Sequence, residues 1–258
     1  MNIVIVGGGA TGIEVAGILS EMKKFVLPND YPDMPSSLMH IYLIEAGPRL
    51  LAGMSEESSA HAEQFLREMG VNILLNKRVV DYRDHKVVLE DGTEIATRTF
   101  IWVSGVTGVT IGNLDASLIG RGGRIKVDSF NRVEGMNNVF AIGDQCIQLA
   151  DENYPNGHPQ LAQVAIQQGE LLAKNLIRME KGQEMKPFHY RNLGSMATVG
   201  RNRAVAEFSK VKMQGWFAWV MWLVVHLRSI LGVRNKMIVL LNWIWNYFTY
   251  DQSMRMIV

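Results

Sequence analysis

A glycine loop at the start of the chain constrains its fold more than any other feature. Residues 2–6, NIVIV, predict a buried strand. Gly7, Gly9 and Gly12 then form a G-x-G-x-x-G motif that leads into a predicted helix. In this context Gly7 permits a tight turn, Gly9 lets a pyrophosphate approach the backbone, and Gly12 lets helix and strand pack closely. The motif therefore predicts a dinucleotide site at the helix N-terminus, and a glycine-rich turn without a ligand is the alternative.

A carboxylate ends the second predicted strand. Glu45 follows the apolar segment HIYLI, where it can accept hydrogen bonds from both ribose hydroxyls of a dinucleotide. Because a 2′-phosphate would be repelled there, the pattern favours NAD(H) over NADP(H). The spacing from the glycine loop is longer than usual, and a proline-rich insert at residues 28–35 accounts for the excess. We expect this insert to be a loop, since proline breaks regular elements.

The first 107 residues predict one α/β unit. A helix is expected over residues 55–70, followed by a third strand. Alternating residues around the Asp91-Gly92 turn predict an antiparallel meander, and residues 99–105 predict a return strand. This order is typical of a doubly wound, Rossmann-like α/β fold.

Two further candidate sites follow. NVFAIGD, residues 138–144, predicts a buried strand that ends on Asp144, which is either a ligand for a hydroxyl group or an ordinary cap or turn residue. A long helix is then predicted with Pro159 in its first turn. Gln163 and Gln167 share one face of this helix, which suits a neutral ligand with carbonyl oxygens. Solvated surface glutamines are the alternative.

Charge and aromatic residues set the tail apart. The net charge of the 258 residues is +1, but residues 181–258 hold 11 Lys and Arg against 3 Asp and Glu, together with five of the six tryptophans. The apolar runs 215–225 and 237–245 are shorter than the ~20 residues of a spanning helix. We expect two helices lying in one membrane leaflet, with basic groups at lipid phosphates. An oligomer interface or buried core is the alternative, while the apolar content argues against nucleic acid.

In this order, the motifs resemble those of the type II NADH dehydrogenases, the single-subunit flavoprotein NADH:quinone oxidoreductases. VIVGGGATGIEVAGILSE is similar to that family's second glycine motif, IYLIEAGPRLL to its second strand, and FIWVSGV to the return strand beside nicotinamide. NVFAIGD is similar to its flavin motif and PQLAQVAIQQG to its quinone-site helix. YRNLGSMATVGRNRAV and the Trp-rich tail also match, so the resemblance covers essentially the whole chain.

The resemblance implies hydride transfer from NADH to FAD and two-electron reduction of a quinone in a respiratory chain. It implies a peripheral protein on the cytoplasmic face of the inner (plasma) membrane, and leaves a homodimer open. Glu14, Gln163 and Gln167 are then expected to be catalytic, although Glu14 has an alternative role as a favourable charge near a helix N-terminus. The motifs and the resemblance together assign cofactor binding to Gly7, Gly9, Gly12, Glu45, Gly105, Gly143, Asp144 and Ala162. Arg234 or Lys236 is a candidate for a quinone entry from its position alone.

One departure from the family limits these expectations. Full-length members carry an earlier glycine motif for the FAD adenosine diphosphate, and this sequence has a single G-x-G-x-x-G. We therefore expect the chain to be a C-terminal portion of a family member, with an incomplete FAD site. We expect it to bind NADH, and whether the chain alone catalyses the reaction is left open. The alternatives are a non-catalytic, membrane-associated NADH-binding remnant and another flavoprotein reductase of the same superfamily. The single Cys146 argues against reductases that use paired cysteines and indicates a reducing compartment.

The expected organisation has three parts. Residues 1–107 are expected to form the NADH-binding domain. Residues 108–182 are expected to form the returning part of an FAD-binding domain with the quinone-site helix. Residues 183–258 are expected to form a small β segment and the membrane-anchoring tail.

Overall fold

The computed structural model describes residues 1–33, 35–109, 111–209 and 211–249. Two compact units are present, one formed by residues 1–104 and 194–258 and the other by residues 105–193. The division by function into three parts stays a prediction.

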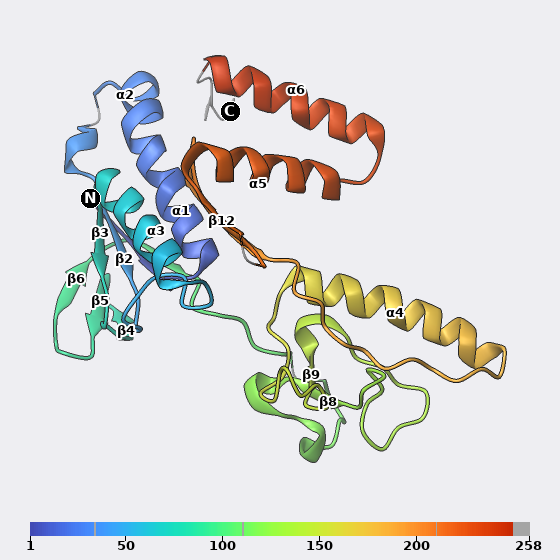
Figure 1. Cartoon of the computed structure of the whole chain (residues 1–258). Helices are drawn as coiled ribbons and strands as arrows, with labels where there is room; N and C mark the ends of the chain where they lie inside the picture. The colour runs from blue at the N-terminus through green and yellow to red at the C-terminus, as the bar shows by residue number, and fades with distance from the viewer. Residues whose placement is uncertain (34, 110, 210, 250–258) are drawn as a thin grey trace. The chain divides into compact units, whose positions relative to one another are not determined.

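A four-stranded parallel sheet forms the centre of the first unit. Its strands β1 (Asn2–Val6), β2 (His40–Ile44), β3 (Val71–Leu74) and β7 (Thr99–Trp102) have the order β3-β2-β1-β7. Figure 1 shows β2 and β3 of this sheet side by side. In register, Ile3 of β1 lies opposite Ile41 of β2 and Thr99 of β7. Helices α1 (Ala10–Glu21) and α3 (Glu56–Glu68) connect the first three strands. The predicted Rossmann-like α/β fold is confirmed.

Alternate residues of β1 enter two different cores, because side chains alternate between the faces of a strand. Ile3 and Ile5 pack in the core that contains Ile13 of α1. Val4 and Val6 pack in a second core with Val87. Val87 belongs to the predicted antiparallel meander of β4 (Val79–Arg83), β5 (Lys86–Leu89) and β6 (Glu94–Ala96). The central sheet is thus covered by helices on one face and by the meander on the other.

The C-terminal part of this unit is an antiparallel sheet followed by two helices. These elements are β10 (Ser195–Gly200), β11 (Arg203–Phe208), β12 (Val211–Gln214), α5 (Gly215–Ser229) and α6 (Val233–Thr249). Val199 and Val205 join the core of α1, whereas Ala204 and Ala206 pack against Ala218 of α5. The small sheet therefore lies between α1 and α5. Within the described ranges, no helix is long and apolar enough to cross a membrane.

The second unit has less regular structure. Strands β8 (Ile125–Val127) and β9 (Cys146–Gln148) pair in parallel, and α4 (Ala162–Glu180) is its long helix. Short 3₁₀ turns lie at Ala116–Leu118, Arg121–Gly123 and Gly143–Gln145.

The predicted strand NVFAIGD is wrong. Phe140 forms only an isolated bridge with Arg132, and Val139 is 48% exposed. A strand needs a hydrogen-bonded neighbour along its length, and among the described residues of this unit only β8 and β9 pair as named strands. The apolar pattern therefore folds into an extended segment that leads to the 3₁₀ turn.

Two proline predictions are also corrected. Pro28 lies in the first turn of the short helix α2 (Leu27–Asp30), where a missing N–H is tolerated. A π-helical turn, Met22–Val26, joins α1 to α2, and a 3₁₀ turn follows at Ser36–Leu38. Pro159 precedes α4, whose cap is Leu161, so the helix begins later than its sequence pattern predicts.

Candidate functional site

The glycine loop between β1 and α1 has the close contacts that its motif predicts. Gly7 has a φ of +116°, and a Cβ there would lie 2.8 Å from the carbonyl oxygen of Val103. A Cβ on Gly12 would lie 1.8 Å from the carbonyl oxygen of Gly7, so only glycine lets α1 approach β1 this closely. Gly9 is the N-cap of α1, and a Cβ there would meet nothing within 4 Å. Open space therefore lies beside Gly9 at the helix N-terminus, and a pyrophosphate contact there stays a prediction.

Glu45 lies beside this loop at the end of β2. Its Oε2 accepts from the backbone N–H of Gly8 at 2.5 Å, and its Oε1 accepts from that of Gly47 at 2.7 Å. A Cβ on Gly8 would lie 2.7 Å from Leu50 and 3.0 Å from Glu45. Gly8 therefore packs closely against these two side chains, a contact that the motif alone does not indicate. The half-buried carboxylate is positioned by backbone donors, and its nucleotide contact stays a prediction.

The side chain of Glu14, on α1, contacts the small C-terminal sheet. Its Oε1 lies 3.5 Å from the backbone nitrogen and 3.4 Å from the hydroxyl of Thr198, on β10. Burial raises the pKa of the Glu14 carboxyl above its ordinary value, while Thr198 and the charge of His226 oppose that rise. Thr198 lies 184 residues away along the chain, so no local pattern predicts this contact.

A pH-dependent stability is expected from Glu14. Because its folded-state pKa is raised, its stabilising contribution is present at low pH and is lost as pH rises through that pKa. Glu14→Gln should therefore stabilise the protein near about pH 8 and change its stability little near about pH 4. Urea unfolding at both pH values measures this. Glu152→Gln, at an exposed position, is the matched control, and equal effects of Glu14→Gln at both pH values would contradict the raised pKa.

In the second unit, Gln168 positions the turn that carries Asp144. Gln168 is 1% exposed, and its Oε1 accepts from the N–H of Gly143 at 2.7 Å. Gly143 has a φ of +67°, and a Cβ there would lie 3.2 Å from Ala165 of α4. The exposed Asp144 follows, and its backbone carbonyl accepts from the side chain of Gln160 at 3.0 Å. The sequence motif indicates Gly143 and Asp144 but not Gln168, which adjoins Gln167.

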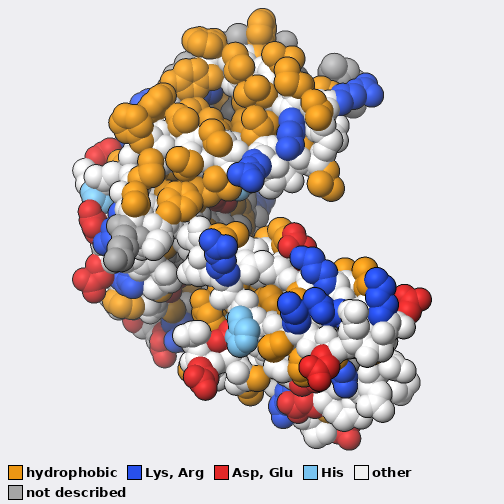
Figure 2. Space-filling view, turned by 45° about the vertical axis from the view of Figure 1, so that its right-hand side comes forward, with side chains coloured by type: hydrophobic (Ala, Val, Ile, Leu, Met, Phe, Trp, Pro, Cys, Tyr) orange, Lys and Arg blue, Asp and Glu red, His pale blue; other side chains and the backbone are white. Residues whose placement is uncertain are grey.

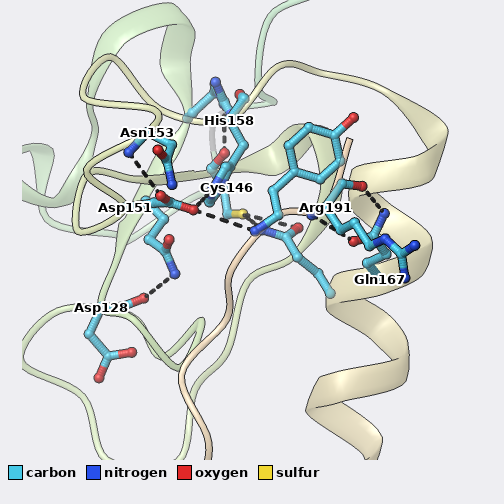
Figure 3. Close-up of polar contacts among 11 residues, drawn as sticks. Asp128, Cys146, Asp151, Asn153, His158, Gln167 and Arg191 are labelled. Carbon is cyan, nitrogen blue, oxygen red and sulfur yellow. Dashed lines mark hydrogen bonds and ion pairs between the residues drawn. The ribbon is translucent and has the colours of Figure 1, made fainter. Parts of the chain in front are cut away.

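The two glutamines expected at a quinone site bind the backbone of the segment after α4. Gln167 donates to the carbonyl of Arg191 at 2.9 Å and accepts from its N–H at 3.1 Å (Figure 3). Gln163 accepts from the N–H of Leu193 at 3.0 Å. Both amides therefore fasten residues 191–193 to α4, and Ala162 is exposed at the start of the same helix. A contact with quinone stays a prediction for these residues.

The residue just before that segment, Tyr190, is anchored by a buried pair that the sequence pattern does not indicate. His158 Nε2 lies 3.0 Å from Asp151 Oδ2, and both side chains are almost fully buried (Figure 3). The same carboxylate accepts from the N–H of Tyr190 at 3.4 Å, and the rings of His158 and Tyr190 are in edge contact. Burial raises the pKa of Asp151, but hydrogen bonds led by that from His158 outweigh it and lower the pKa overall.

The predicted sites fall into the two compact units. Gly7, Gly9, Gly12, Glu14 and Glu45 come together around the first turn of α1 in the first unit. Gly143, Asp144, Ala162, Gln163 and Gln167 lie in the second unit, and Gly105 begins it with a φ of +98°. Among the residues that the structure describes, no group of three or more His, Cys, Asp or Glu could hold a metal ion.

Two family models match the chain. The pyridine nucleotide-disulphide oxidoreductase model matches residues 1–169, and the NDH2 C-terminal domain matches residues 192–250.

Among curated proteins, the chain is 35% identical to the type II NADH:quinone oxidoreductase NdhA of Mycobacterium tuberculosis, over 94% of this chain and 53% of the relative. It is 32% identical to the internal alternative NAD(P)H-ubiquinone oxidoreductase A1 of Arabidopsis thaliana, over 96% of this chain and 51% of the relative. The chain thus spans about half the length of the curated relatives it matches.

Among solved structures, NDH2 from Plasmodium falciparum in complex with NADH is similar, with a TM-score of 0.85 at 20% identity. The match covers 96% of this chain and 66% of that one. LpdA from Mycobacterium tuberculosis matches with a TM-score of 0.57 at 19% identity, over 80% of this chain and 39% of that one. At these identities the likeness shows the fold.

Proposed function

The chain belongs to the pyridine nucleotide-disulphide oxidoreductase family and carries the NDH2 C-terminal domain, and from this we propose that it acts as part of a type II NADH:quinone oxidoreductase. The observation that carries the proposal is the combination in one chain of a dinucleotide loop, an NDH2 C-terminal domain and an exposed apolar helix pair. The curated relatives named above support it, because their names specify NADH or NAD(P)H and a quinone.

NADH is the proposed ligand of the first unit. The open space at Gly9 and the N-terminus of α1 suit its pyrophosphate, and the Glu45 carboxylate suits an unphosphorylated ribose. In this arrangement Glu14 lies one helical turn from the loop, and Thr198 fixes its side chain. We assign Glu14 to the hydride-transfer site, where a partly buried carboxyl can hold or release a proton.

A test of the nucleotide assignment reverses the charge of Glu45. Glu45→Arg should shift the ratio of NADH to NADPH affinity about tenfold or more toward NADPH, because Arg attracts the 2′-phosphate that Glu repels. Fluorescence titration with both nucleotides measures the ratio. Glu45→Gln is the control for the backbone contacts, since it removes the charge but keeps an acceptor for Gly8 or Gly47. An unchanged ratio in Glu45→Arg would refute the assignment.

FAD and quinone are proposed for the second unit. The exposed Asp144, on a turn that Gln168 fixes, is suited to accept from a hydroxyl of the ribityl chain, so these residues fit one part of FAD. FAD, when bound, would supply a hydride acceptor that passes two electrons to a quinone. Gln163 and Gln167 stay candidates for the quinone carbonyls, and their bonds to residues 191–193 mean that quinone would have to share or displace backbone partners.

Membrane association is proposed for α5 and α6. Their apolar side chains are exposed and gather on one side of the molecule, with Lys and Arg among them (Figure 2). The exposed apolar residues are Trp216, Phe217, Met221, Val224, Val225, Leu231, Val233, Met237, Ile238, Leu241, Ile244, Trp245 and Phe248. Arg228 lies in the last turn of α5, and Arg234 and Lys236 lie in α6. An exposed apolar surface on helices that also carry these cations suits an interfacial position, which we propose to be at the cytoplasmic face of the membrane. The same face leaves a homodimer as a further proposal.

The overall function is tested by NADH-driven quinone reduction. The chain is assayed alone and together with the N-terminal half of a type II NADH dehydrogenase, which carries the other glycine motif. Flavin colour and quinone reduction in the mixture are expected. If the chain binds NADH and lipid but the mixture neither binds FAD nor reduces quinone, the non-catalytic alternative is favoured instead.

A further inference from the structure

A cavity of about 420 Å³ lies in the first unit, on the side of α1 away from the glycine loop. Its walls come from the end of α1, the π-helical turn Met22–Val26, the end of α3 and the turn between β10 and β11. Phe25, Val26 and Met69 supply apolar wall, and the charged lining residues are Glu21, Lys24, Glu68, Arg201 and Arg203. The cavity is therefore amphipathic, with more positive than negative groups.

The cations of this cavity differ in how firmly they are held. Arg203 lies 3.3 Å from Glu68 and donates to the carbonyl of Phe65, so its guanidinium is fixed. Lys24 is exposed, and its ammonium lies 5.2 Å from the centre of the Phe25 ring. Lys24 can therefore turn toward an anion that enters the cavity, next to an arginine that is already in place.

Asn202 adds an acceptor that lacks a donor. Its backbone is left-handed, with a φ of +63°, and its Oδ1 is buried without a hydrogen-bond partner among the described residues. A buried acceptor without a donor is costly. A ligand that carries a hydroxyl group beside its anionic group would supply that donor once the Asn202 side chain, which lines the cavity, turns its Oδ1 toward the ligand.

Arg201 connects the cavity to the helix pair α5–α6. Its guanidinium donates to the carbonyls of Asn246 at 3.0 Å and Tyr247 at 3.3 Å, in the final described turn of α6. The neighbouring Phe248 is 77% exposed. Because Arg201 lines the cavity and contacts α6, the cavity lies beside one end of the helix that is proposed to enter lipid.

We propose that the cavity binds the headgroup of an anionic glycerophospholipid, with the phosphodiester at Lys24 and Arg203 and a free hydroxyl at Asn202. The assignment rests on the proposed membrane association, because that places headgroups within reach. A free phosphate ion could make the same contacts with Lys24 and Arg203 as the phosphodiester of the lipid. The hydroxyl contact and the connection to α6 favour the lipid.

The experiment compares Lys24→Gln with Lys23→Gln. Both variants lose one positive charge in the same π-helical turn, but only Lys24 lines the cavity. Co-sedimentation is measured with vesicles of phosphatidylcholine, with and without phosphatidylglycerol. Lys24→Gln should lower the affinity for phosphatidylglycerol vesicles about fivefold, and Lys23→Gln clearly less. Vesicles that contain phosphatidic acid, whose headgroup lacks the glycerol hydroxyl, are compared as well. The wild-type chain should prefer phosphatidylglycerol, and Asn202→Gly, which tolerates the left-handed backbone, should lose that preference.

A titration with soluble glycerophosphoglycerol, followed by NMR of the full chain, makes the test independent of the membrane anchor. The site is supported if the titration gives saturable shifts at Asn202 and if Lys24→Gln weakens this binding. That result would support the site even if the wild-type chain bound no vesicles and the proposed anchor failed. Equal losses in the two lysine variants would show general surface charge and overturn the proposal. Inorganic phosphate that binds as well as glycerophosphoglycerol would overturn the lipid assignment, and an absence of saturable shifts would overturn the site.

Discussion

Gly12→Ala is expected to abolish measurable NADH binding and to lower the free energy of unfolding by about 3 kcal/mol. The added methyl group would lie 1.8 Å from the carbonyl oxygen of Gly7, and that oxygen belongs to backbone that cannot turn aside as a side chain would. The N-terminal turn of α1 must therefore move away from β1, which displaces the N–H groups proposed to face the pyrophosphate. Fluorescence titration with NADH and urea unfolding measure the two effects.

Two other alanine variants separate binding from folding. A Cβ on Gly9 meets nothing within 4 Å, so Gly9→Ala should lose at most about 1 kcal/mol, from the less favourable N-cap residue, but place a methyl group in the space proposed for the pyrophosphate. Its NADH affinity should fall strongly, with a much smaller change in unfolding than in Gly12→Ala. Gly53, also without neighbours within 4 Å, gives a control in which neither quantity changes. Wild-type NADH affinity in both Gly9→Ala and Gly12→Ala would contradict a dinucleotide site at this loop.

The first unit could be predicted closely because its signals are local. The glycine motif, the apolar strands and the Asp91-Gly92 turn each specify their own backbone, and the parallel sheet follows from their order. The close packing of Gly8 was missed because it arises from contacts with Leu50 and Glu45, which only the folded chain brings near. The same reason applies to Thr198 beside Glu14.

Predictions failed where structure depends on neighbours. NVFAIGD has the composition of a buried strand, but composition cannot supply a partner strand. The pattern of α4 likewise could not distinguish Gln167, which binds the backbone of Arg191, from Gln168, which holds the turn at Gly143. Adjacent positions on a helix point about 100° apart, so each meets a different segment. Sequence spacing identified the helix, and only the contacts identify what each amide holds.

The membrane proposal predicts a large loss of lipid binding when α5 and α6 each receive a charge. Phe217 is 69% exposed and Leu241 is 59% exposed, so glutamate at either position should leave the fold intact. Burial of such a side chain in lipid contributes about 1.5–3 kcal/mol, and a buried carboxylate adds a further cost. Each of Phe217→Glu and Leu241→Glu should therefore weaken vesicle binding at least about tenfold, and together about a hundredfold.

Val80→Glu is the matched control for this pair. Val80 is 57% exposed on β4, in the meander, so it loses a comparable apolar surface away from the helix pair. If all three variants reduce vesicle binding equally, added negative charge explains the loss and the exposed face of α5 and α6 is not the contact. If only the helix variants lose binding, and circular dichroism shows their folds unchanged, the two short helices act as an interfacial anchor. The prediction does not depend on FAD or turnover, because lipid binding by α5 and α6 needs neither.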